Sequence, residues 1–211
     1  PETIEPLRAA FDGLLPQENI RIWHAPGPVR EEHPGNDTRR QIAELIREAF
    51  LASLQPDVIH ICGLFEGYVD DAVTSIGQFD QRTPVSVTLH DLIPLSNPDT
   101  YLKPNPRYAQ YYQRKFEALK KSHCLLAVSE FSAHEGIANL GFAANRIINT
   151  SEAVEPHFRL FNLDAATKQH LQQKFQITRP FVFYTGGCDG RKNLPRLIQA
   201  YASLPAALRQ T

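Results

Sequence analysis

Apolar residues recur at helical spacing in several stretches of the chain. The clearest stretch is 38–54, where six apolar side chains fall on one face and predict a helix with a buried stripe. Asp37 or Thr38 is the expected N-cap of this helix. The same spacing predicts helices over 4–15, 108–121 and 165–175, and a weaker one over 69–77. The stripe of the clearest helix consists of Ile42, Leu45, Ile46, Ala49, Phe50 and Leu54.

Short runs rich in β-branched and other apolar residues alternate with these helices. They predict strands at 58–62, 85–89, 124–128, 146–149 and 181–184, and an alternating pattern adds a strand at 19–24. The proline-rich segments 25–37 and 91–106 are expected to be loops. A repeated order of strand and helix with short turns is typical of an α/β protein with a doubly wound parallel sheet.

Composition narrows the classes of function. The chain has 211 residues, of which 42% are hydrophobic and 21% charged, as expected of a globular protein. Its net charge of −1 argues against nucleic acid as a partner, because nucleic-acid binding usually requires a basic surplus. Three scattered cysteines indicate neither a disulfide framework nor a zinc site, which favours a reducing, cytoplasmic compartment. No signal peptide or membrane-spanning run is recognised.

Several polar or flexible residues follow predicted strands directly. In an open α/β sheet, ligands bind beyond the carboxyl ends of the strands, which makes Gly63, His90, Asp91 and Ser129 candidates for a cleft. An imidazole at position 90 can donate one hydrogen bond and accept another, but it can also simply end a strand in a solvated turn. Asp91 can likewise cap the next turn, and Ser129 can cap the next helix. His60 lies inside a strand, where packing or a local hydrogen bond is expected.

A glycine-rich corner follows the last predicted strand. Gly186 and Gly187 end the run, Arg191 and Lys192 follow, and a helical pattern opens at Leu194. A strand, a glycine turn and a helix N-terminus together form an anion cradle, because free backbone N–H groups and the helix dipole favour negative charge. A plain β-turn with two solvated cations fits the same residues.

Four short segments of the chain belong together as a pattern, in the order Pro56–His60, Thr88–Leu95, Ala127–Ser132 and Phe181–Leu194. In this order they resemble the family-4 glycosyltransferases of the GT-B fold, and especially the bacterial mannosyltransferase-like enzymes of surface polysaccharide assembly. The resemblance covers most of the chain. It implies a Rossmann-like N-terminal domain over 1–152, an inter-domain crossing over 153–178, and the start of a donor-binding domain over 179–211, so that most of the second domain would be missing.

The resemblance also implies a reaction. A retaining transferase of this kind moves a hexose, here expected to be mannose, from a nucleotide-diphosphate sugar to a glycan or lipid-linked acceptor without a metal or other cofactor. His90 would be the catalytic residue facing the cleft, with Asp91, Gly63 and Ser129 on the acceptor side. The donor phosphates would be held by Gly186, Gly187, Arg191 and Lys192. We expect no transfer activity from these 211 residues alone, because the acidic motif that binds nucleotide and sugar in the family is not among them.

The sequence departs from the family pattern at two places. Three other functions also have to be weighed. The early glycine-rich acceptor loop is not recognised, and the crossing reads Ala153-Val154-Glu155 where relatives commonly carry Gly-Val-Asp. A GT-B-fold nucleotide-sugar epimerase and a non-catalytic interaction domain are the alternatives, whereas an oxidoreductase is disfavoured because no G-x-G-x-x-G motif follows an early strand. Six cations over 103–121 present either a solvated helix face or peripheral contact with the inner membrane face: Lys103, Arg107, Arg114, Lys115, Lys120 and Lys121.

Overall fold

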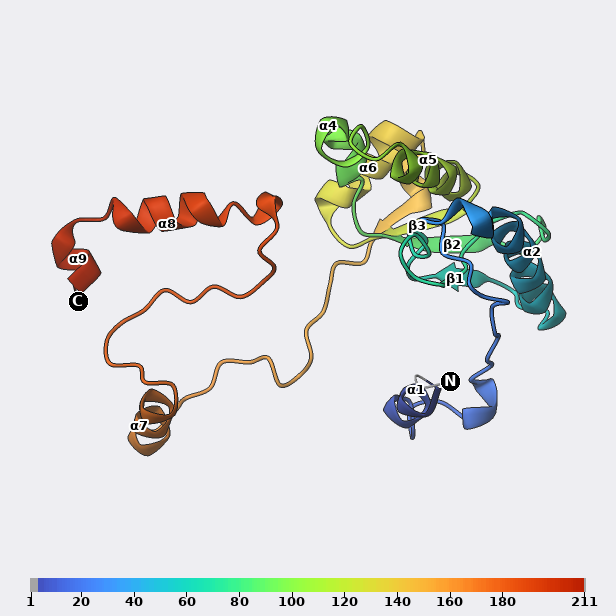
Figure 1. Ribbon diagram of the computed structural model, residues 1–211. Coiled ribbons are helices and arrows are strands. Elements are labelled where there is room, and N and C mark those ends of the chain that lie inside the picture. Colours follow the sequence, from blue (N-terminus) through green and yellow to red (C-terminus); the bar gives the residue numbers. More distant parts are fainter. Residues whose placement is uncertain (1–3, 211) are drawn as a thin grey trace. The chain divides into compact units, whose positions relative to one another are not determined.

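The structure, a computed structural model, describes residues 4–210, and its chain divides into two compact units (Figure 1). The first unit is Pro1–Ala153 and the second is Val154–Thr211. Each unit is described by itself below.

The first unit is built on a four-stranded parallel sheet in the order β1-β2-β3-β4. In the register of the sheet, Val87 lies between Ile61 and Leu125. A parallel sheet with flanking helices confirms the α/β, Rossmann-like fold class, although the connection from β1 to β2 contains no helix. The strands are β1 (Ile59–Ile61), β2 (Val85–Leu89), β3 (Cys124–Ala127) and β4 (Ile147–Asn149).

Helices pack on the sheet face to which Val87, Leu89 and Leu125 point. Parallel crossovers are right-handed, so neighbouring strands in sequential order have their connections on the same face. Gly136 of α6 lies so close to this face that a Cβ there would be 2.9 Å from Ile147 Cδ1, which explains a glycine within the helix. The main helices are α1 (Ile4–Ala10), α2 (Asp37–Ser53), α5 (Pro106–Lys120) and α6 (Glu130–Leu140), with 3-10 turns η1 (Gln17–Asn19), η2 (Pro34–Asn36) and η3 (Ala144–Arg146).

Helix α5 confirms its predicted buried stripe. Asn105 caps the helix by accepting a hydrogen bond from the Tyr108 N–H, and Pro106 occupies the first turn, where a missing N–H costs nothing. Phe116 and Leu119 join the central core. That core consists of Ile61, Leu64, Ile76, Val85, Val87, Leu89, Leu92, Phe116, Leu119, Leu125 and Phe142.

Helix α2 has nearly the predicted bounds, but the face predicted to be buried is wrong. Ile42, Leu45 and Ile46 are 48%, 43% and 46% exposed, whereas the buried residues of the helix are Arg40, Ala43, Glu44 and Glu48. The polar face of the helix is the buried one, because its charged side chains have ion-pair partners inside the first unit. The predicted N-cap is also wrong, since the helix begins at Asp37 after Asn36, which makes no side-chain capping bond.

The inward face of α2 forms ion pairs with α5 and with the loop before α2. Arg40 Nη1 lies 3.0 Å from Glu44 Oε1, and Arg114 Nη1 of α5 lies 2.8 Å from the same oxygen. Arg114 also pairs with Glu31, and Arg107 pairs with Asp37. Buried charges are tolerated when they are paired in this way, and the pairs fix which face of the helix is buried.

Three local predictions in the first unit are wrong. Residues 19–24 form no strand, because no described strand pairs with them; Trp23 packs instead against a small cluster around Ala43. Residues 69–77 form no helix, because Asp71 accepts hydrogen bonds from Val29 N and Arg30 N and holds the chain against residues 28–30. Segment 91–106 is not entirely loop, since it contains α3 (Ile93–Ser96) and α4 (Pro98–Tyr101).

The second unit is helical where it is regular. Helix α7 lies within the predicted range, but the strand predicted at 181–184 is wrong. Phe183 is 78% exposed, and no strand within 154–210 lies beside this run to supply backbone hydrogen bonds. The elements are α7 (Ala165–Lys174), η4 (Gly190–Lys192), α8 (Leu194–Ala202) and α9 (Ala206–Gln210). Within 4–210, no helix has both the length and the apolar character that crossing a membrane requires.

Candidate functional site

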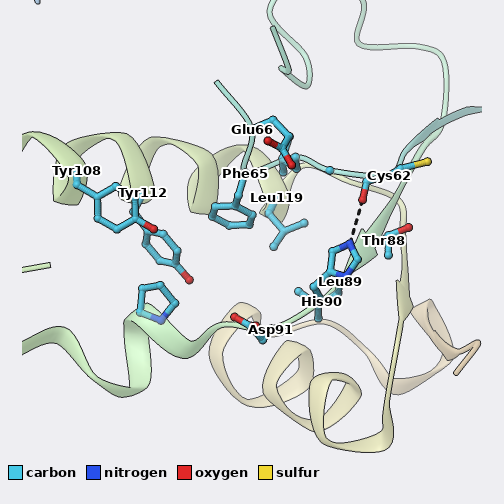
Figure 2. A pocket seen from close by; sticks show the side chains of 13 residues that line it. Cys62, Phe65, Glu66, Thr88, Leu89, His90, Asp91, Tyr108, Tyr112 and Leu119 are labelled. Atoms are coloured by element: carbon cyan, nitrogen blue, oxygen red, sulfur yellow. Dashed lines mark hydrogen bonds between the residues drawn. The ribbon is translucent and has the colours of Figure 1, made fainter. Parts of the chain in front are cut away.

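A cavity of about 430 Å³ opens at the carboxyl ends of β1 and β2 (Figure 2). Its walls come from the loop that follows β1, from the end of β2 and the residues after it, and from helix α5. Its volume lies within the range usual for small-molecule sites, ~300–1,000 Å³. The lining residues are Cys62, Gly63, Leu64, Phe65, Glu66, Thr88, Leu89, His90, Asp91, Pro94, Tyr108, Tyr112 and Leu119.

His90 is exposed and directly follows the carboxyl end of β2. Two hydrogen bonds hold it, one to its side chain and one to its backbone. Its Nε2 lies 3.3 Å from the Cys62 carbonyl oxygen (Figure 2), so Nε2 carries the donated proton and Nδ1 is left to accept one. Its backbone carbonyl accepts a 2.5 Å hydrogen bond from Ser132 Oγ of α6. The imidazole therefore has a defined orientation and a basic nitrogen that the Cys62 contact does not use.

Asp91 lines the cavity and also closes the following turn. Its Oδ1 accepts a hydrogen bond from Ile93 N at 3.1 Å, which is the turn-capping role weighed above. Its negative charge has a second effect, on the tyrosines of α5. Burial raises the pKa of Tyr108 and of Tyr112, and the Asp91 carboxylate adds to both increases. Both phenols therefore stay protonated and can donate hydrogen bonds.

Ser129 does not line the cavity. It is the N-cap of α6, where its Oγ accepts a hydrogen bond from Ser132 N at 3.1 Å. Its Oγ also lies 3.0 Å from Ser132 Oγ, which in turn holds the His90 carbonyl. Ser129 thus supports the strand end from behind. Gly63, by contrast, lies in the cavity wall, where a Cβ would approach the Glu66 side chain to 3.1 Å.

An aromatic wall, which sequence reasoning missed as a site feature, forms one side of the cavity. It consists of Phe65, Tyr108 and Tyr112, with the Phe65 and Tyr112 ring centroids 5.0 Å apart. The two tyrosines were expected only as part of a buried helical stripe, and the only signal for Phe65 was its position just after a strand. The Tyr112 hydroxyl is buried and has no hydrogen-bond partner among the described residues.

His60 stands outside this cavity and has both ring nitrogens occupied. Nδ1 lies 2.8 Å from Ser86 Oγ and Nε2 lies 3.0 Å from Thr88 Oγ1, both on the neighbouring strand β2. The local hydrogen bonding expected for this residue is confirmed. Among residues 4–210, no group of three or more His, Cys, Asp or Glu side chains is placed to hold a metal ion.

The glycine corner of the second unit contains a carboxylate that the sequence interpretation overlooked. Asp189 Oδ1 accepts a hydrogen bond from Arg191 N at 2.9 Å and lies 3.1 Å from Arg191 Nε. The Arg191 hydrogen bond lowers the pKa of Asp189. Gly186 has φ +142°, and its neighbour Gly187 offers its carbonyl to the Tyr184 hydroxyl at 2.8 Å. An anion at this corner would compete with Asp189 for Arg191.

The basic residues around α5 do not form one free cationic surface. Lys115 is buried, and its ammonium donates to the Thr74 carbonyl at 2.6 Å. Arg107 and Arg114 are held by the carboxylates of α2 and of the loop before it. Lys103 pairs with Asp99, and Lys120 pairs with Glu117, each a residue three or four positions away in the sequence. The expectation of a solvated helix face is wrong for Lys115, whereas peripheral membrane contact stays a prediction.

The parallel sheet and the cavity at its carboxyl edge define an α/β domain with a cavity of small-molecule size, and the sequence identifies its family. Residues 7–151 match the profile of Glycosyltransferase Family 4, and the chain belongs to this family. It is 30% identical over 209 residues to serotype-specific mannosyltransferase WbdA of Escherichia coli, covering 99% of this chain and 26% of that protein. It is also 30% identical over 123 residues to O-antigen chain mannosyltransferase B of Escherichia coli, covering 58% of this chain and 31% of that protein.

The chain therefore spans about a quarter of the length of the WbdA protein that it matches. No solved structure gives a significant match.

Proposed function

We propose that this chain is part of a retaining glycosyltransferase that moves mannose from a nucleotide-diphosphate sugar to a glycan acceptor in surface polysaccharide synthesis. The observation that carries the proposal is the cavity at the ends of β1 and β2, where His90, Asp91 and Gly63 meet within a family-4 domain. The mannosyltransferase names of two relatives support the choice of sugar.

In this proposal the first unit binds the acceptor. The basic nitrogen of His90 and the carboxylate of Asp91 can both accept a hydrogen bond from an acceptor hydroxyl, which would orient its oxygen for attack on the anomeric carbon. The aromatic wall would hold the apolar face of the sugar ring. Thr88 and Glu66 offer further polar groups at the rim.

The second unit would hold the donor diphosphate. Departure of the nucleoside diphosphate leaves negative charge, which Lys192, Arg191 and the amides of Gly186 and Gly187 would stabilise. Each charge-assisted hydrogen bond contributes roughly 1.5–3 kcal/mol. These groups would act on the departing diphosphate only, so the contacts to the nucleotide and to the sugar would come from elsewhere.

The test is transfer by a protein that carries this chain together with a complete donor-binding domain. A panel of nucleotide-diphosphate hexoses is offered with an oligomannoside acceptor, and the anomeric configuration of the product is read by proton NMR. We expect transfer from the mannose donor with retained configuration and none from the 211 residues alone. Inversion would contradict the mechanism. Conversion of the donor without any acceptor would favour the epimerase instead.

A further inference from the structure

The charged residues lining the cavity all have the same sign. Glu66 and Asp91 contribute two exposed carboxylates, and none of the described lining residues is Lys or Arg. Arg107 and Arg114 of α5 are paired with the carboxylates of Glu31, Asp37 and Glu44, none of which lines the cavity. A phosphate entering this cavity would meet two carboxylates and no Lys or Arg among the described lining residues, and placing like charges in a site is a common way of rejecting a wrong ligand.

The remaining lining favours an uncharged ring with hydroxyl groups. Phe65 and the two tyrosines offer flat apolar surface, and tyrosine combines that surface with a polar tip. The Tyr112 side chain is only 2% exposed, and its hydroxyl is a buried donor without a described partner. Such orphaned groups are rare in folded proteins and call for a partner. A sugar hydroxyl is a partner of the right kind.

We propose that this cavity binds an uncharged sugar residue of the acceptor and excludes phosphorylated groups. The inference rests on the proposed function and makes it more specific. The acceptor that the first unit recognises is then the neutral, non-reducing end of a growing glycan, and a lipid-linked pyrophosphate lies outside the cavity. Asp91 and Glu66 set this selectivity, and the Tyr112 hydroxyl hydrogen-bonds the bound ring.

The first experiment measures binding to the 211-residue chain by ligand-observed saturation-transfer NMR. The probes are methyl α-mannopyranoside, mannose 1-phosphate and inorganic pyrophosphate. We expect the methyl mannoside to bind in the millimolar range and the 1-phosphate about tenfold more weakly or worse, because of the like charges in the cavity. Pyrophosphate should not displace the mannoside. Displacement of the mannoside by pyrophosphate, equal or tighter competition of mannose 1-phosphate for the mannoside site, or no saturable binding of the mannoside at tens of millimolar would overturn the proposal.

Charge variants then locate the selectivity. Asp91→Asn keeps an oxygen that can accept from Ile93 N, so the turn is preserved while the charge is removed. We expect it to reduce the preference for mannoside over mannose 1-phosphate at least about threefold. The control is Asp99→Asn, which removes the same charge from the exposed surface of α4 and should leave the preference unchanged. An unchanged preference in Asp91→Asn would contradict the assignment.

A pair of tyrosine variants separates binding from folding. Tyr112→Phe removes a hydroxyl that has no described partner, so it should weaken mannoside binding several-fold without lowering the unfolding midpoint. Tyr68→Phe removes a hydroxyl that accepts a hydrogen bond from Asn105 Nδ2 at 2.9 Å, and neither of these residues lines the cavity. It should lower stability slightly and leave binding alone. The reverse pattern would show that Tyr112 is structural only.

The two proposals fail in different measurements. If transfer uses another class of donor but the cavity still prefers the neutral mannoside, the proposed function fails and the binding inference stands. If transfer from the mannose donor is observed but mannose 1-phosphate binds as well as the methyl mannoside, the inference fails and the function stands.

Discussion

Glu48 of α2 gives the sharpest prediction about how the first unit is held together. Its carboxylate is buried and accepts four hydrogen bonds. Oε1 accepts from Ser75 Oγ at 2.6 Å, and Oε2 accepts from the backbone N–H groups of Gln78, Phe79 and Asp80 at 2.7, 2.6 and 3.3 Å. One side chain thus fixes the loop that leads into β2, the strand that directly precedes His90.

The magnitude follows from these contacts. A hydrogen bond to a charged group contributes roughly 1.5–3 kcal/mol, but Gln78 and Phe79 are exposed, so water can replace part of what is lost. We therefore expect Glu48→Ala to lower the free energy of unfolding by about 3–5 kcal/mol. Glu48→Gln keeps one acceptor oxygen and should lose about half as much.

The assay is urea unfolding followed by the fluorescence of Trp23. This is the only tryptophan in the chain, and it packs against the cluster of Val29, Ala43 and Val73, so it reports the first unit alone. The matched control is Glu117→Ala on α5, an exposed partner of Lys120, which should lose less than about 1 kcal/mol. If Glu48→Ala loses no more than this control, the carboxylate does not anchor the loop.

Two further predictions concern a buried amine and a glycine. Burial lowers the pKa of Lys115 to about 7 in the folded chain, below its ordinary 10.5. The unfolded state therefore binds more protons between these values, and the free energy of unfolding should rise with pH there by up to about 1.4 kcal/mol per unit. Lys115→Met should remove this rise in urea titrations at a series of pH values; an equal slope in both chains would show that the amine is charged in the fold. Gly67 has φ +96°, and a Cβ there would lie 2.4 Å from the Ala72 carbonyl oxygen, so Gly67→Ala should cost at least about 2 kcal/mol. Gly35→Ala, where a Cβ meets nothing within 4 Å, is the control in thermal melts, and equal midpoints would refute the clash.

The elements of the first unit that are predicted best are those whose structure is determined by the local sequence pattern. The run Val85–Leu89 alternates buried and half-buried side chains as a strand must, and Ser129 caps α6 as its position indicates. Helix α5 likewise follows its apolar spacing. These signals are local, and the structure around them does not oppose them.

The predictions fail where contacts with residues distant in the sequence determine the structure. Helix α2 buries Glu44 and Glu48 in place of Ile42 and Leu45, because carboxylates with partners on α5 and in the loop before β2 can be buried at little cost. Periodicity alone cannot reveal such partners. The run at 181–184 has the composition of a strand, but a strand forms only beside another strand.

The candidate site was predictable at the strand ends and less so elsewhere. His90 and Asp91 follow a strand directly, and the general rule for open sheets places them at the cavity. The aromatic wall comes from a helix face, where Tyr112 looks like any other core residue. Asp189 was overlooked because a phosphate site is recognised in a sequence by its basic residues. An acidic residue beside them gives no signal of such a site.

The account rests on His90 as the group that meets the reacting sugars, and transfer kinetics test this directly. In a protein that carries this chain with a complete donor-binding domain, His90→Ala should lower kcat for mannose transfer at least about 100-fold, as expected for loss of a group that orients the attacking hydroxyl. His60→Ala removes an imidazole whose two nitrogens already bind Ser86 and Thr88, and it should change kcat less than about threefold. Near wild-type kcat in His90→Ala would contradict the central claim.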